Sequence, residues 1–147
     1  MPKETFFNLP KEKKDRVIDS AIDEFSQKYY EQVNLSDIIR KAGIPRGSFY
    51  QYFEDKKDLY LHLVDITKNK KFEYLGDAYS NPKLPFLDTI ALLYKRGIKF
   101  ALAYPKLVEI FEKLLHNQNQ IYEEIIASNK HLAIDFYKKM IVQDQED

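Results

Sequence analysis

Cysteine is absent from this sequence, and long apolar runs are absent as well. Without cysteine the chain cannot form disulfides, cysteine-ligated zinc sites, iron–sulfur clusters or a thiol nucleophile, a composition that fits a reducing cytoplasm. No stretch approaches the roughly 18 apolar residues of a membrane span. The first residues, Met1–Phe7, lead into charge rather than into an apolar segment of signal-peptide length. We therefore expect a soluble cytoplasmic protein that makes no membrane contact.

Glycine, proline and β-branched residues are scarce. The 147 residues include four glycines and six prolines, and valine and threonine together supply eight residues. Because β-sheets need frequent turns and favour β-branched side chains, this composition argues against a sheet. Lysine, leucine and isoleucine are the commonest residues instead. We predict an all-α fold.

An excess of charge of either sign is also missing, since 23 basic residues balance 23 acidic ones. No global basic field indicates a nucleic-acid partner, so a DNA-binding surface must be local. The histidines His62, His116 and His131 lack the spacing of a zinc-binding helix face. The adjacent carboxylates Asp23–Glu24 and Glu123–Glu124 point to different faces, and no phosphate loop or nucleophile elbow is present. We expect neither an enzyme nor a metal or cofactor site.

Prolines and the spacing of apolar residues divide the chain into helices. The clearest break is Asn81–Pro85, where two prolines within four residues exclude a helix and where we place a hinge between subdomains. The predicted helices span about residues 10–28, 35–42, 46–53, 56–79, 86–103, 105–116 and 119–140.

The segment from Asn34 to Lys56 has the order helix, glycine turn, helix. Asn34 can cap the first of the two helices, Gly43 can adopt the positive φ that ends it, and Pro45 has a φ suited to starting the next. This is the layout of a helix-turn-helix, whose second helix enters the major groove of DNA.

The second helix of this motif has a surface that suits DNA. At 100° per residue, Phe49 and Phe53 point inward. Residues 40–57 contain five basic and two acidic side chains, so the region has a local charge of about plus three. The outward face carries Gly47, Ser48, Tyr50 and Gln51, with Arg46 and Tyr52 on its flanks.

An ordered set of motifs covers about residues 10–63: Val17-Ile18-x-x-Ala21-x-x-x-Phe25, Asp37-Ile38, Ala42-Gly43-Ile44 and Gly47-Ser48-Phe49-Tyr50-x-Tyr52-Phe53-x-x-Lys56-x-x-Leu59. The set resembles the DNA-binding domain of the tetracycline-repressor-like (TetR/AcrR) family of bacterial regulators. The resemblance implies that Ser48, Tyr50, Tyr52 and Lys56 hold DNA, largely by its phosphates. It also implies that Arg46, Gly47 and Gln51 face the bases and that Asn34 caps its helix near a phosphate.

Three positions depart from the family pattern. Tyr29 stands where a glycine usually follows the first helix, so either its backbone is unusual or that helix ends differently. Val33 stands where serine or threonine is frequent, and Pro45 stands where the family has serine, although Pro45 keeps a start compatible with a helix.

The family further implies a DNA-binding domain at 8–54 and a helical effector-binding and dimerisation domain at 55–147, which is shorter than usual. We expect a ligand-responsive repressor that binds a palindromic double-stranded DNA operator as a homodimer. The alternative is a helical protein-interaction module that has lost operator binding. The expected effector is a small apolar or aromatic molecule, with Tyr94, Phe111 and Tyr122 in its pocket wall. The expected dimer seam comprises Ile121, Ile125, Leu132 and Phe136.

Overall fold

The structure is a computed structural model that describes residues 1–80 and 84–145. Over these residues the chain is helical and contains no β-strand, so the all-α prediction is confirmed. The helices follow the predicted ranges to within a few residues, and two short helices, α1 and η1, were not predicted. In chain order they are α1 (Glu4–Phe7), α2 (Lys11–Gln27), the 3-10 helix η1 (Tyr30–Gln32), α3 (Leu35–Ala42), α4 (Arg46–Tyr52), α5 (Lys56–Ser80), α6 (Phe86–Ala103), α7 (Pro105–Asn117) and α8 (Gln120–Gln145).

Helices α2, α3 and α4 pack around one apolar core. Phe49 and Phe53 are fully buried there, and their ring centroids lie 5.4 Å apart in a stacked arrangement. Burial of a large aromatic side chain contributes about 2 to 3 kcal/mol. These two rings therefore fix which face of α4 points to solvent. The other buried members of this core include Val17, Ala21, Phe25 and Ile38.

The turn between α3 and α4 depends on Gly43. This residue has a φ of 64°, in the left-handed region that glycine adopts without a steric cost. Its N–H donates to the carbonyl of Arg40 at 3.1 Å, and the N–H of Ile44 donates to that of Ile39 at 3.3 Å. Pro45, with a φ of −63°, then leads into α4. The predicted glycine turn is confirmed.

The backbone at Tyr29 is ordinary. Helix α2 ends at Gln27, Lys28 is extended with a φ of −128°, and Tyr29 has a φ of −64° and a ψ of 152°. Tyr29 then starts the short helix η1. Of the two alternatives for this position, the structure has the altered helix end, so the missing family glycine costs no strained conformation.

Helix α1 is, with η1, one of two elements that the sequence did not predict. Its Phe6 is only 2% exposed, and the Phe6 ring lies 4.8 Å from the ring of Phe53 and 6.2 Å from that of Tyr52, between centroids. The residues before position 8, which the predicted domain 8–54 leaves out, therefore pack onto the same core.

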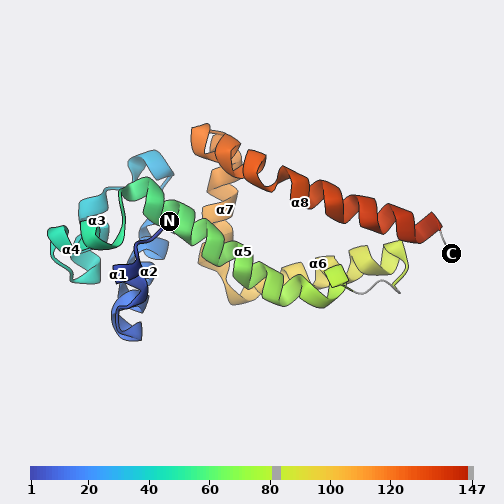
Figure 1. Ribbon diagram of the computed structural model, residues 1–147, viewed down its shortest axis with the longest axis horizontal. Helices are drawn as coiled ribbons and strands as arrows, with labels where there is room; N and C mark the ends of the chain where they lie inside the picture. Colours follow the sequence, from blue (N-terminus) through green and yellow to red (C-terminus); the bar gives the residue numbers. More distant parts are fainter. Residues whose placement is uncertain (81–83, 146–147) are drawn as a thin grey trace.

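Helix α5 connects the two halves of the molecule (Figure 1). It starts beside the segment between α2 and α3 and runs to the opposite end, where α6 packs along its second half. Helix α7 returns and packs against α2, and α8 starts beside α7 and extends toward the far end again. Buried side chains of these helices include Phe100, Leu107, Ile110, Leu114, Ile121 and Ile125.

Ile121 and Ile125 correct one expectation. They are 6% and 9% exposed and belong to the core of the chain itself, so they are not available for a dimer seam. Apolar residues have the same spacing along a helix whether they pack inside one chain or against a partner chain. The sequence pattern therefore does not distinguish a core contact from a dimer contact. The side chains of Leu132 and Phe136 lie outside the described residues, as does most of the predicted hinge at 81–85.

Polar contacts also join the two halves. Asp23 on α2 accepts from Lys41 on α3 at 2.7 Å and from Lys106 on α7 at 2.9 Å. The hydrogen bond from Lys41, followed by that from Lys106, lowers the pKa of the Asp23 carboxyl to about 2. Glu31 accepts from Asn117 and Asn119, so η1 is tied to the turn between α7 and α8.

Within the described part of the chain, none of the helices has the length and apolar character that a membrane span requires.

Candidate nucleic-acid interface

The outward face of α4 is the surface that the sequence predicted. Gly47, Tyr50 and Gln51 are exposed, with Tyr50 at 42%, and Ser48 is half-buried. Phe49 on the opposite face is fully buried. The face therefore offers two hydroxyls, one amide and a glycine that leaves the backbone uncovered. Such groups can donate to phosphate oxygens and to base edges.

Ser36 connects the starts of α3 and α4. The side-chain oxygen of Asn34 accepts from the backbone N–H of Ser36 at 2.9 Å, so Asn34 caps α3 as predicted. The Ser36 hydroxyl accepts from Arg46 Nη1 at 3.1 Å. Asn34 and Arg46, which are distant from each other in sequence, are thus brought to one exposed surface beside the outward face of α4.

Tyr52 does not lie on this surface. It was predicted to flank the reading face and to hold DNA, but it is only 5% exposed. Its ring contacts Phe6 of α1, and the ammonium group of Lys13 lies 5.7 Å from the ring centroid. The N-terminal segment (residues 1–9) covers the flank on which the helical geometry placed Tyr52, so Tyr52 has a packing role.

Lys56 differs from its prediction in a similar way. Its ammonium group donates to the carbonyls of Tyr30 at 2.9 Å and of Val33 at 3.0 Å, and lies 4.5 Å from the centroid of the Tyr30 ring. The first turn of α5 passes beside the segment between α2 and α3, so the amine is used inside the protein. Lys56 therefore holds this segment, and its contact with a phosphate stays a prediction.

Most of the basic side chains near α4 are paired with carboxylates. Arg40 contacts Asp37 at 2.9 Å, and Lys41 contacts Asp23 and Glu24. Lys57 contacts Glu124 on α8 at 2.7 Å. The local positive charge expected for residues 40–57 is therefore largely compensated by acidic neighbours that are distant in sequence. Arg46, which donates to the uncharged hydroxyl of Ser36, is an exposed cation beside the outward face of α4.

The N-terminal segment contributes contacts that the sequence analysis missed. Lys3 Nζ donates to the carbonyl of Tyr50 at 2.9 Å, and the backbone N–H of Lys3 donates to that of Tyr52 at 2.8 Å. The hydroxyl of Thr5 donates to the carbonyl of Gln51. In the sequence, the pair Phe6-Phe7 is the feature that could have indicated this segment. The sequence analysis used these residues only to exclude a signal peptide.

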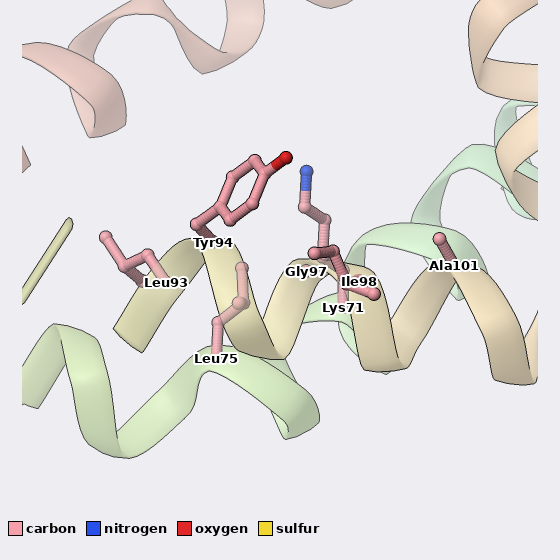
Figure 2. A pocket seen from close by; sticks show the side chains of 7 residues that line it. All are labelled: Lys71, Leu75, Leu93, Tyr94, Gly97, Ile98 and Ala101. Atoms are coloured by element: carbon pink, nitrogen blue, oxygen red, sulfur yellow. The ribbon is translucent and has the colours of Figure 1, made fainter. Parts of the chain in front are cut away.

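A pocket lies between α5 and α6 (Figure 2). This pocket has a volume of about 390 Å³ and is lined by Lys71 and Leu75 of α5 and by Leu93, Tyr94, Gly97, Ile98 and Ala101 of α6. In Figure 2 the Tyr94 hydroxyl and the Lys71 amine point toward one another.

Of the three residues predicted for an effector pocket, Tyr94 lines this one. Phe111 is outside the lining, although the Lys71 amine lies 5.7 Å from the centroid of its ring. Tyr122 is also outside the lining, in the first turn of α8, where its N–H donates to the side chain of Asn119.

The segment that carries this interface is similar to known proteins. Residues 17–63 match the family described as bacterial regulatory proteins, tetR family. The chain is 38% identical over 64 residues to the biofilm operon icaADBC HTH-type negative transcriptional regulator IcaR of Staphylococcus aureus, which covers 44% of this chain and 32% of that protein. The chain thus spans about a third of the length of the curated relatives it matches.

Two solved structures resemble the whole described fold. One is a TetR family transcriptional regulator from Chloroflexus aurantiacus, with a TM-score of 0.70 and 37% identity, covering 92% of this chain and 66% of the other. The second is a TetR-like transcriptional regulator from Rhodococcus, with a TM-score of 0.72, 19% identity and coverage of 93% and 76%. At that identity the second structure speaks for the fold alone.

Proposed function

Because this chain belongs to the TetR family of bacterial regulatory proteins, we propose that it is a DNA-binding transcriptional repressor that is not an enzyme and acts in the cytoplasm. The observation that carries the proposal is the outward face of α4, where Tyr50 and Gln51 are exposed. The buried rings of Phe49 and Phe53 hold the opposite face of this helix in the core. The matched relatives that are described as negative regulators support repression rather than activation.

The residues on the described surface divide into two roles. Arg46, Gly47 and Gln51 would face base edges, because an arginine and an amide can each make paired hydrogen bonds in the major groove and a glycine allows close approach. Asn34, Ser48 and Tyr50 would contact phosphates and set the register of the helix on the duplex. Tyr52 and Lys56 would support this surface from inside.

A homodimer on a palindromic operator is part of the proposal. One recognition helix of seven residues buries too little DNA for tight specific binding, and a two-fold partner doubles the contact. With Ile121 and Ile125 buried in the chain itself, the large apolar side chains exposed among those that the structure describes on α8 are Ile126 and Ile134, each 41% exposed. Sedimentation at micromolar concentration tests this part, and a monomer there would contradict it.

Ligand response is proposed at the pocket between α5 and α6. Its apolar lining favours an apolar or aromatic effector, and the amine of Lys71 and the hydroxyl of Tyr94 could meet an acceptor group on that molecule. Helix α5 would transmit the effect, since it extends from this pocket to the base of the reading surface.

The decisive experiment is a gel-retardation assay on the DNA upstream of the chain's own gene. A repressor of this kind retards a palindromic fragment, and its affinity falls steeply with salt because phosphate contacts release counterions. The alternative, a protein-interaction module, needs neither a palindrome nor a salt dependence. Failure to retard any upstream or selected duplex at low salt would favour that alternative.

A further inference from the structure

The N-terminal segment, defined as residues 1–9, contacts the C-terminal end of the proposed recognition helix. The last carbonyls of an α-helix have no partner within the helix and must be satisfied from outside. In α4 these carbonyls belong to Tyr50, Gln51 and Tyr52. The N-terminal segment bonds to all three, through the Lys3 side chain, the Thr5 hydroxyl and the Lys3 backbone N–H respectively.

The segment that makes these bonds is itself anchored in the core. Phe6 is 2% exposed, and its ring centroid lies 4.8 Å from that of Phe53 and 5.7 Å from that of His62. The Lys14 amine donates to the carbonyl of Phe7 at 3.0 Å and ties the end of α1 to α2. The three bonds to α4 therefore start from a fixed support and not from a loose arm.

Helix α4 depends on such support. It has seven residues, and helices this short are not stable without tertiary contacts. At its start, Pro45 provides no side-chain cap. Phe49 and Phe53 fix the rotation of α4 about its axis, but its tilt is also set by whatever holds its end. The hydroxyl and amine of the N-terminal segment are bonded at that end.

We propose that Lys3 and Thr5 are positioning residues for operator recognition, which clamp the C-terminal end of α4 without touching DNA themselves. The inference rests on the proposed function, because the clamp is proposed to set the tilt of α4 and thereby the position of Gln51 against the bases. Thr5 is exposed, and Lys3 is half-buried and also pairs with the exposed Glu54 at 3.0 Å, so the clamp concerns alignment more than overall stability. The competing explanation is that Lys3 contacts a phosphate directly.

Thr5→Val and Lys3→Met test the clamp, since each keeps most of the side-chain volume and removes the donor. Thr5→Ser restores the hydroxyl and serves as the rescue variant. Lys99→Met, an exposed lysine on α6, is the matched control for loss of a positive charge. The probes are a duplex selected by the wild-type chain from a random pool and a scrambled duplex of equal length.

We expect Thr5→Val and Lys3→Met each to weaken binding of the selected duplex about 2- to 10-fold, the range for one hydrogen bond. Binding of the scrambled duplex, the salt slope and the melting temperature should stay at wild-type values, and Thr5→Ser should bind normally. Hydrogen exchange at the amides of the last turn of α4 should accelerate in Thr5→Val.

Three results would overturn the clamp. Equal weakening of both duplexes by Lys3→Met, with a salt slope reduced by about one, identifies a direct phosphate contact. Unchanged affinity in both variants shows that α4 is held without the clamp. Unchanged exchange in α4 shows that the bonds do not restrain the helix. If the wild-type chain selects no duplex, the proposed function fails instead, and the exchange measurement still decides whether the segment restrains α4.

Discussion

The ammonium group of Lys56 lies 4.5 Å from the ring centroid of Tyr30 and donates to the carbonyl of the same residue. A second hydrogen bond reaches the carbonyl of Val33, the residue directly before the Asn34 cap of α3. One side chain at the first turn of α5 therefore fixes the segment that leads into the helix-turn-helix.

Replacement of this lysine separates a structural role from a phosphate contact. We expect Lys56→Met to lower the free energy of unfolding by about 1 to 2 kcal/mol, because two hydrogen bonds and a cation–π contact are lost. Urea denaturation measures this. The salt slope of DNA binding should be unchanged, and a slope reduced by about one would show instead that the amine reaches a phosphate. Lys57→Met, which removes a surface ion pair, should cost less than about 1 kcal/mol.

The two glycines of the helix-turn-helix should respond oppositely to alanine. Gly43 has a φ of 64°, so Gly43→Ala should destabilise the protein by about 1 kcal/mol or more. Gly47 is helical with open space where a Cβ would stand, so Gly47→Ala should stabilise it by up to about 1 kcal/mol. Thermal unfolding measures both. The added methyl of Gly47→Ala should still weaken binding of a selected duplex, and undiminished binding would remove Gly47 from the interface.

Gln51→Ala and Arg46→Ala should relax sequence preference. Loss of a contact to a base edge costs about 1 to 3 kcal/mol at one position of the operator and little on a scrambled duplex. Binding to a set of duplexes with single base changes measures this. Tyr50→Phe provides the contrast, since loss of a phosphate contact should weaken all duplexes alike. If Gln51→Ala lowers affinity equally for every duplex, its assignment to the bases is wrong.

The lowered pKa of the Asp23 carboxyl predicts that part of the stability of the fold is lost in acid. Its pKa in the folded chain, about 2, lies below the ordinary 3.8, so the folded state binds this proton less readily than the unfolded state. The contribution to stability is complete above about pH 4 and is lost as the pH falls toward about 2. We expect Asp23→Asn to be less stable than the wild type at pH 6, by about 1 kcal/mol for this partly exposed network.

The difference between Asp23→Asn and the wild type should disappear near pH 2. Melting temperatures measured across this range test the prediction, with the exposed Asp19→Asn as control. A difference that stays constant down to pH 2 would show that the pKa is not lowered.

The helices could be predicted because local signals mark their ends. Pro85 and Pro105 stand at helix starts, and Gly43 ends α3 with the predicted positive φ. The outward position of Tyr50 and Gln51 followed from the helical repeat alone. These features depend on residues within a few positions of one another.

The differences between prediction and structure at the site come from contacts between residues that are distant in sequence. Tyr52 was assigned to an open flank because the helical repeat does not reveal that Phe6 packs there. For Lys56 the resemblance implies a phosphate contact, and nothing local shows that the carbonyls of Tyr30 and Val33 lie within reach of its amine. In each case the side chain has the chemistry that DNA requires, and the tertiary fold uses it elsewhere.

The length of α5 has a mechanical consequence for the proposed ligand response. Lys71 at the pocket and Lys56 beside the helix-turn-helix are fifteen residues apart along α5, a distance of about 22 Å at 1.5 Å per residue. A rotation of this rod by about 5° around the pocket end displaces the other end by about 2 Å. Hydrogen bonds to base edges have an allowed distance range of roughly 0.5 Å. An effector therefore needs to change the pocket by no more than a side-chain rearrangement to misalign both halves of an operator complex.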